Sequence, residues 1–188
     1  MEDTHSIHKT LRTDIEAGTE IAVYDCYQCG KCSAGCPFAN DMDYPPSMVL
    51  RMLQSDDPAL DEKVLRSYAI WLCLACETCI ARCPQEVDIP IMMDFLRAES
   101  LKRRMVNPRA KSIVAFHRSF LDSIRYTGKL YEIGFIIAYK VRSWDLFQDI
   151  FLAPKMFLLG KLGILPHGMK NLSKLFSKFN KKKREASA

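Results

Sequence analysis

Residues 26–37 read CYQCGKCSAGCP, and residues 73–84 read CLACETCIARCP. Both stretches follow the frame C-x2-C-x2-C-x3-C-P, and together they contain all 8 cysteines of the 188-residue chain. Three cysteines spaced by two residues can bind three corners of a cubane 4Fe-4S cluster from one local stretch of backbone. In the two-cluster form of this run, the fourth cysteine binds the other cluster. The sequence therefore predicts two 4Fe-4S clusters.

The same rule divides the thiols into two crossed ligand sets. We expect one cluster on Cys26, Cys29, Cys32 and Cys83, and the other on Cys73, Cys76, Cys79 and Cys36. The two frames form an internal repeat in which every cysteine is displaced by 47 residues. Such a repeat predicts two similar half-sites related by an approximate two-fold axis, neither of which is complete without the other.

Smaller features of the motifs suggest how the clusters are enclosed. Gly30 and Gly35 fit a loop whose backbone approaches sulfur closely, although ordinary turn glycines would look the same. Apolar side chains in or beside the motifs are expected to form a wall that controls solvent access to the clusters, with plain core packing as the alternative. These side chains are Tyr27, Leu72, Leu74 and Ile80.

Disulfides and structural zinc are the other uses that eight thiols could have. Disulfides require an oxidising compartment, but residues 1–20 (MEDTHSIHKTLRTDIEAGTE) contain no apolar stretch typical of a secretory signal, so we expect a cytoplasmic protein. Structural zinc would use pairs of C-x2-C, and two four-thiolate sites can be drawn from these cysteines. Zinc does not explain the third cysteine of each run or the repeated Cys-Pro ending, and it remains the main alternative.

The surrounding sequence predicts helices and contains no clean alternating strand. Pro45-Pro46-Ser47 reads as a helix start followed by apolar Met48, Leu50, Met52 and Leu53. Asp57-Pro58 opens a segment whose apolar residues recur at helical spacing up to Cys73. Asp88 is expected to cap a helix that begins near Pro90 and runs toward Met105. We therefore expect an all-α ferredoxin-type domain over residues 1–105.

Residues 106–188 are predicted to be a basic, apolar helical extension for subunit docking. A helix after Pro108 would present Ile113, Phe116, His117, Phe120, Leu121 and Ile124 on one face, and further apolar pieces lie at 130–142, 145–160 and 169–180. None reaches the roughly 18 uncharged residues of a membrane helix, so no transmembrane segment is expected. Residues 1–100 carry 17 acidic and 8 basic side chains, whereas residues 101–188 carry 5 acidic and 19 basic ones. This asymmetry favours an acidic partner, an anionic surface or a solvated tail over nucleic acid, because no nucleic-acid reader module is present.

No catalytic residue is predicted. Every thiol is used as a ligand, the four histidines are scattered, and no G-x-G-x-x-G nucleotide fingerprint is present. Clusters with four protein ligands each have no open iron for Lewis-acid chemistry. Outer-sphere electron transfer is the expected activity.

The two motifs, the helical insert between them and the VDIP sequence at 87–90 resemble the small iron-sulfur subunit, the C-type subunit, of heterodisulfide reductase from methanogenic archaea and relatives. The resemblance covers residues 20–105 and includes all 8 cysteines. It implies an electron-relay subunit of a soluble cytoplasmic oxidoreductase complex, not itself catalytic. That relay passes electrons from the flavin- and cluster-bearing A-type subunit to the catalytic B-type subunit, which reduces the heterodisulfide of coenzyme M and coenzyme B in methanogenesis. A larger complex containing a hydrogenase or a dehydrogenase is also compatible.

Other classes remain open. The chain lacks the further cysteines of succinate dehydrogenase-type subunits and the cysteine-rich repeats of glycerol-3-phosphate dehydrogenase-type subunits, but another anaerobic dehydrogenase or reductase is an alternative. A free diffusible two-cluster ferredoxin would use the same ligands, yet it would not need a long basic extension. A redox-sensing regulator would couple cluster loss to nucleic-acid binding through the basic tail.

Overall fold

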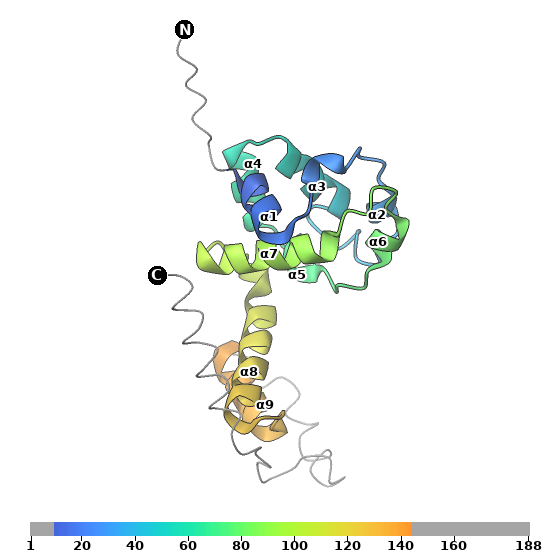
Figure 1. Ribbon diagram of the computed structural model, residues 1–188. Coiled ribbons are helices and arrows are strands. Elements are labelled where there is room, and N and C mark those ends of the chain that lie inside the picture. Colours follow the sequence, from blue (N-terminus) through green and yellow to red (C-terminus); the bar gives the residue numbers. More distant parts are fainter. Residues whose placement is uncertain (1–9, 144–188) are drawn as a thin grey trace. The chain divides into compact units, whose positions relative to one another are not determined.

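The computed structural model describes residues 10–143 of the chain (Figure 1). The chain divides into two compact units, Met1–Ala110 and Lys111–Ala188. Every regular element in the described part is helical, which confirms the all-α fold class. None of the helices between Leu11 and Ser143 combines the length and the hydropathy needed to cross a lipid bilayer.

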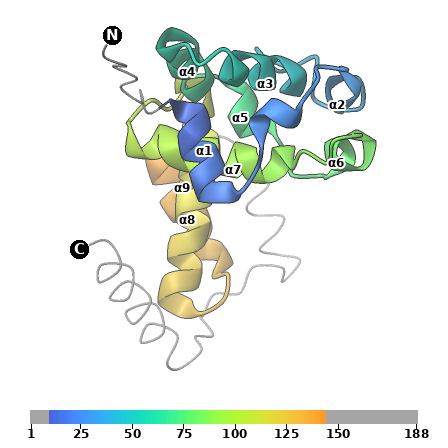
Figure 2. The same ribbon diagram turned by 45° about the horizontal axis from the view of Figure 1, so that its top comes forward.

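The first unit contains seven α-helices and two 3-10 turns within its described residues. In chain order they are α1 (Leu11–Thr19), η1 (Val23–Asp25), α2 (Lys31–Ala34), α3 (Pro46–Gln54), α4 (Pro58–Leu65), α5 (Ala69–Leu72), α6 (Thr78–Arg82), α7 (Ile89–Lys102) and η2 (Pro108–Ala110). The longest of them, α7, packs against α1, α4 and α5, whereas α2 and α6 lie side by side away from it (Figures 1 and 2). Because α2 and α6 each lie within one cysteine motif, their pairing brings the two motifs together.

The helix starts follow from local sequence chemistry. Asp57 caps α4 by accepting a hydrogen bond from the Ala59 amide at 2.9 Å, with Pro58 in the first turn. Asp88 caps α7 in the same way through the Ile91 amide at 3.1 Å. Both helix starts confirm the sequence prediction.

The core lies between α1, α3, α4, α5 and α7. Its fully buried side chains include Ile15, Val49, Leu53, Val64, Ile70, Met92, Met93 and Leu96, each 0% exposed. Burying a side chain of this size contributes about 1.5–3 kcal/mol, so this layer is a large source of stability for the unit. It lies behind the cysteine loops and holds the helices that flank them.

Of the apolar residues named for α3, Leu50, Met52 and Leu53 are buried, whereas Met48 is 47% exposed. One detail of the sequence-based prediction was wrong. The segment from Asp57 to Cys73 is not one continuous helix, since α4 ends at Leu65 and α5 begins at Ala69. The break has a physical cause in Asp43, whose carboxylate accepts the amides of Tyr68 and Ala69 and so starts a new helix there.

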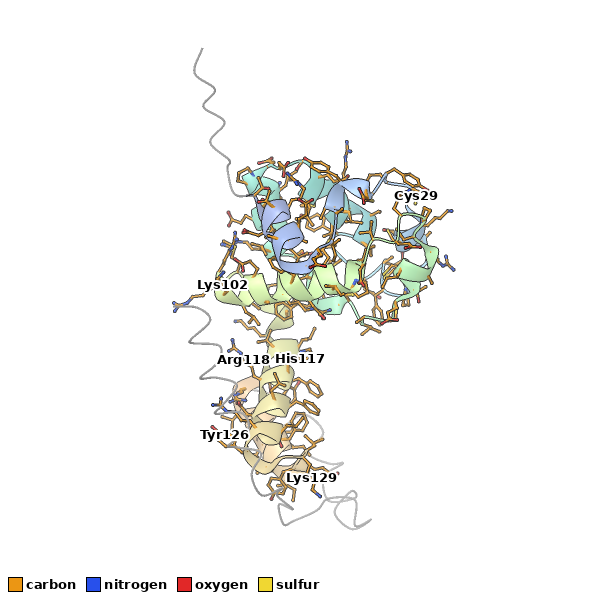
Figure 3. All side chains as sticks on the ribbon, in the orientation of Figure 1. Cys29, Lys102, His117, Arg118, Tyr126 and Lys129 are labelled. Carbon is orange, nitrogen blue, oxygen red and sulfur yellow. The ribbon has the colours of Figure 1, made fainter. Side chains whose placement is uncertain are left out.

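The second unit, where described, consists of α8 (Lys111–Thr127) and α9 (Glu132–Ser143) packed on each other. Phe116 and Phe120 of α8 contact Phe135 of α9 edge to face, with ring centroids 5.2 Å and 6.2 Å apart. These two phenylalanines lie on the predicted apolar face, but Leu121 does not pack there and is 64% exposed. His117 and Arg118 lie on the exposed surface of α8 (Figure 3). The predicted pieces at 145–160 and 169–180 lie outside the described residues.

Candidate iron-sulfur site

Each cysteine motif winds through two residues in the left-handed backbone region. In the first motif they are Gln28 (φ 62°) and Gly30 (φ 75°), and in the second they are Ala75 (φ 51°) and Glu77 (φ 60°). The second pair is displaced from the first by the same 47 residues as the cysteines. A non-glycine residue in this conformation costs about 1–2 kcal/mol of backbone strain. The rest of the loop must therefore hold Gln28, Ala75 and Glu77 in place. The sequence repeat is therefore also a repeat of backbone conformation.

The first three thiols of the second motif share a cavity with a thiol of the first motif. Cys73, Cys76 and Cys79 line this cavity together with Cys36, which comes from the end of the other motif. The other lining residues are mostly apolar and include Leu72, Leu74, Phe38, Met42, Ile89 and Pro90. Leu72 and Leu74 thus lie where the sequence predicted an apolar wall.

The fourth cysteine of the second motif lies near the first motif. The pKa of the Tyr27 hydroxyl is raised, first by desolvation and then by the surrounding thiols of Cys29, Cys83 and Cys26. Cys83 thus acts on a tyrosine of the first motif, and its neighbour Arg82 packs against Gly35 of that motif. The sulfur of Cys83 also accepts a hydrogen bond from the Val87 amide at 3.4 Å. Cys32, the remaining cysteine of the first motif, is buried.

The second cysteine of each motif lies at the protein surface. Cys29 and Cys76 are exposed, while the other cysteines are buried or half-buried. Each has an exposed apolar neighbour at the equivalent position, Tyr27 at 57% and Leu74 at 64% exposure. Cys29 lies at the end of the first unit where α2 and α6 meet (Figure 3). Both half-sites therefore approach solvent through the same corner of the motif.

The thiols of the two motifs differ in their electrostatic environment. Burial raises the pKa of the Cys32 thiol and raises that of Cys79 to about 11, whereas a hydrogen bond with Thr78 lowers the pKa of Cys76. Binding of a metal to the buried thiols would therefore release protons. Within residues 10–143, no three His, Cys, Asp or Glu side chains converge on a single-ion position. A cubane binds each thiolate at a different iron, so thiol donors spread around an apolar cavity fit a 4Fe-4S cluster.

Polar side chains from outside the motifs hold the chain that leads into each of them. Gln54, the last residue of α3, donates its side-chain amide to the Val23 carbonyl at 3.0 Å and to the Cys26 carbonyl at 2.7 Å. Arg97 of α7 donates to the carbonyls of Ile70 and Cys73. Sequence reasoning missed both residues, because each contact spans more than 20 positions and neither residue belongs to a motif.

Gly35 has a different role from the predicted approach to sulfur. Its φ is an ordinary −99°, and an added Cβ would lie 2.6 Å from Cδ of Arg82. The glycine thus makes room for an arginine of the other motif, at the equivalent position in the repeat. Gly30, in contrast, has the positive φ that favours glycine.

Comparison with known proteins identifies the class of this site. Residues 22–87 match the family model described as a 4Fe-4S dicluster domain. The match begins four residues before Cys26 and ends four residues after Cys83, so it contains both motifs. It supports 4Fe-4S clusters as the cofactor.

Curated relatives refine this class and confirm the resemblance to the C-type subunit of heterodisulfide reductase. A 92-residue stretch is 42% identical to a C-type iron-sulfur subunit of the CoB–CoM heterodisulfide reductase of Methanocaldococcus jannaschii, covering 44% of this chain and 46% of the relative. The C-type iron-sulfur subunit of Methanopyrus kandleri is 38% identical over 69 residues, covering 37% of this chain and 34% of the relative. The C-type subunit of the H2:CoB-CoM heterodisulfide,ferredoxin reductase of Methanothermobacter thermautotrophicus is 27% identical over 111 residues, covering 59% and 58%. The alignments thus span between about a third and three fifths of these relatives' own length.

Proposed function

We propose that the chain binds two 4Fe-4S clusters with crossed fourth ligands. Cys26, Cys29, Cys32 and Cys83 would hold one cluster, and Cys73, Cys76, Cys79 and Cys36 would hold the other. The single observation that carries this proposal is the cavity lined by Cys36 together with three thiols of the opposite motif. The packing of α2 on α6 and the close approach of Arg82, the neighbour of Cys83, to Gly35 of the first motif support the reciprocal set.

Substituting each crossed cysteine tests the ligand sets. Cys36→Ala should abolish the cluster of the second motif, and Cys83→Ala should abolish that of the first. Cys76→Ala and Cys29→Ala are the matched controls, because each removes one of the three local ligands of a motif. The EPR signal that disappears in Cys36→Ala should be the same signal that disappears in Cys76→Ala. Loss of the same signal in Cys36→Ala and Cys29→Ala would contradict the crossed assignment.

A bound cluster of this type supplies reversible one-electron transfer, and the chain's own residues determine how such a centre is used. The apolar side chains that line the cavity with Cys36 and Cys73 would limit the access of water to a bound cluster. Cys29 and Cys76 leave one corner of each half-site at the surface. Two surface corners on one domain suit a relay, because electrons can enter at one half-site and leave at the other.

We infer that this relay is a non-catalytic subunit of a cytoplasmic heterodisulfide reductase-type oxidoreductase. Electrons would come from the flavin- and cluster-bearing A-type subunit and pass to the B-type subunit, which would reduce the heterodisulfide of coenzyme M and coenzyme B. The names of the curated relatives support this assignment. The proposed division of labour gives cluster binding to residues 1–105 and subunit docking to residues 106–188.

The second unit has a surface suited to docking. Four large apolar side chains of α8 and α9 are each at least 59% exposed, namely Leu121, Tyr126, Ile137 and Val141. Such side chains gain free energy when a partner covers them. A complex held by apolar burial should survive high salt, whereas binding of nucleic acid by the basic tail should weaken steeply with salt.

An anaerobic affinity purification from the native cytoplasm tests this function. We expect a flavoprotein and a cysteine-rich partner to be recovered with the chain at high salt. Both partners should be reduced and reoxidised through the chain. Recovery of the loaded chain alone would instead favour a free diffusible ferredoxin. Recovery with nucleic acid that salt removes would favour a redox sensor.

A further inference from the structure

Arg97 holds the backbone that leads into the second cysteine motif. Its Nε donates to the Ile70 carbonyl at 2.5 Å, and its Nη2 donates to the carbonyl of Cys73, the first cysteine of that motif. The side chain is only 17% exposed. The guanidinium therefore bridges the last turn before the motif and the first ligand itself.

Gln54 makes the equivalent pair of contacts in the first motif. Its side-chain amide donates to the carbonyls of Val23 and Cys26. These two carbonyls precede those held by Arg97 by 47 positions each, the displacement of the repeat. The residue 47 positions after Gln54 is Leu101 and not Arg97. Gln54 and Arg97 therefore occupy different places in the repeat and reach equivalent carbonyls only in the folded protein. We call these two side chains the clamps.

The two clamps differ in charge. Gln54 is neutral, whereas Arg97 carries a positive charge next to the first ligand of the second motif. The ion-pair partner of Arg97 is Asp94, which lies 2.7 Å from Nη1 and is 65% exposed, so solvent screens it more than the arginine. The charged residues within the motifs, Lys31, Glu77 and Arg82, are all exposed. Arg97 is therefore the least screened of these charges.

We propose that Gln54 and Arg97 are equivalent positioning residues, and that the charge of Arg97 gives the cluster of the second motif the higher reduction potential. This inference rests on the proposed function, because it requires both clusters. Reduction adds a negative charge to a cluster, and a nearby cation stabilises the reduced form. Transfer of one electron from the first-motif cluster to the second-motif cluster would then be favourable, with no bond changed and no proton transferred. Because Cys29 and Cys76 are the exposed cysteines of the two motifs, electrons would enter beside Cys29 and leave beside Cys76.

An EPR-monitored redox titration of the anaerobically purified, cluster-loaded full chain tests the inference. The signal of the second motif is identified by its loss in Cys76→Ala. Arg97→Gln keeps a hydrogen-bond donor and removes the charge, so the midpoint potential of that signal should fall while the other stays constant. Arg97→Lys keeps the charge and should leave the midpoint nearer to that of the wild type. Arg103→Gln, which removes an equal charge from the C-terminal end of the same helix, is the matched control.

A reciprocal variant covers the case in which Arg97→Gln loses its cluster. Gln54→Lys places a charged donor at the neutral clamp and should raise the midpoint of the first-motif signal. Absence of two cubane signals in the wild type would refute the proposed function before any variant is compared. If both signals are present, an unchanged midpoint in Gln54→Lys, or equal shifts in Arg97→Gln and Arg103→Gln, would overturn the inference.

Discussion

Replacing Asp43 with alanine should destabilise the first unit and loosen the second cysteine motif. Asp43 lies in the connection between the motifs, and its carboxylate accepts the amides of Tyr68 at 2.7 Å, Ala69 at 2.8 Å and Tyr44 at 3.0 Å. Tyr68 is the N-terminal cap of α5 and makes no capping hydrogen bond with its own side chain. Asp43 therefore caps α5 from 25 residues away, and α5 leads directly into Cys73.

The size of the effect follows from these contacts. A hydrogen bond to a charged group contributes about 1.5–3 kcal/mol when shielded, and loss of a helix cap typically costs about 1 kcal/mol. Asp43 is exposed, so water replaces part of what is lost. We expect Asp43→Ala to lower the free energy of unfolding by about 2 kcal/mol, or the unfolding midpoint by roughly 10 °C for a domain of this size.

The assay is anaerobic thermal unfolding of the cluster-loaded protein, followed by far-UV circular dichroism and by cluster absorbance at a fixed scan rate. Asp41→Ala removes an equal charge from the same connection and should cost less than about 0.5 kcal/mol. Asp57→Ala removes the local cap of α4 and should cost about 1 kcal/mol. If Asp43→Ala unfolds at the same temperature as Asp41→Ala, the capping role of Asp43 is wrong.

Three further substitutions test other parts of the fold. A hydrogen bond from Arg12 lowers the pKa of Asp56 from 3.8 to about 2. The ionised carboxylate therefore contributes its full stabilisation of the fold above pH 3.8, and this contribution is lost as the pH falls toward 2. At pH about 7, Asp56→Asn should therefore cost about 1 kcal/mol in chemical denaturation after allowance for solvent screening, and an unchanged midpoint would contradict this. Gly30→Ala meets no atom within 4 Å at φ +75°, so it should cost only about 1 kcal/mol of backbone strain and keep both clusters; loss of iron would show that the loop tolerates no side chain. Leu50→Ala in the core should cost about 3 kcal/mol, and a loss below about 1 kcal/mol would mean that the site relaxes around the cavity.

The cysteine frames and helix caps were predictable because their signals are local. Asp57-Pro58 and the Asp88 cap set the starts of α4 and α7 through contacts within three residues. The spacing of the motifs likewise led to the dicluster domain that the family model matches. Local chemistry and the cysteine repeat were thus enough for the fold class.

The supporting contacts of the site could not be predicted in this way. Gln54, Arg97 and Asp43 act on backbone 24 to 31 residues away, and no spacing rule connects a side chain with a carbonyl or an amide at such a distance. Ala75 and Glu77 adopt the left-handed conformation although neither is a glycine, the residue type that would have predicted it. The surrounding loop imposes this conformation on them.

The most direct test of the account is the iron and acid-labile sulfide content of the anaerobically purified chain, measured with its EPR spectrum after reduction. Two cubane clusters would give about eight irons and eight sulfides per chain. About four of each would reduce the site to a single cluster and remove the crossed ligation. Zinc without sulfide would contradict the iron-sulfur assignment altogether.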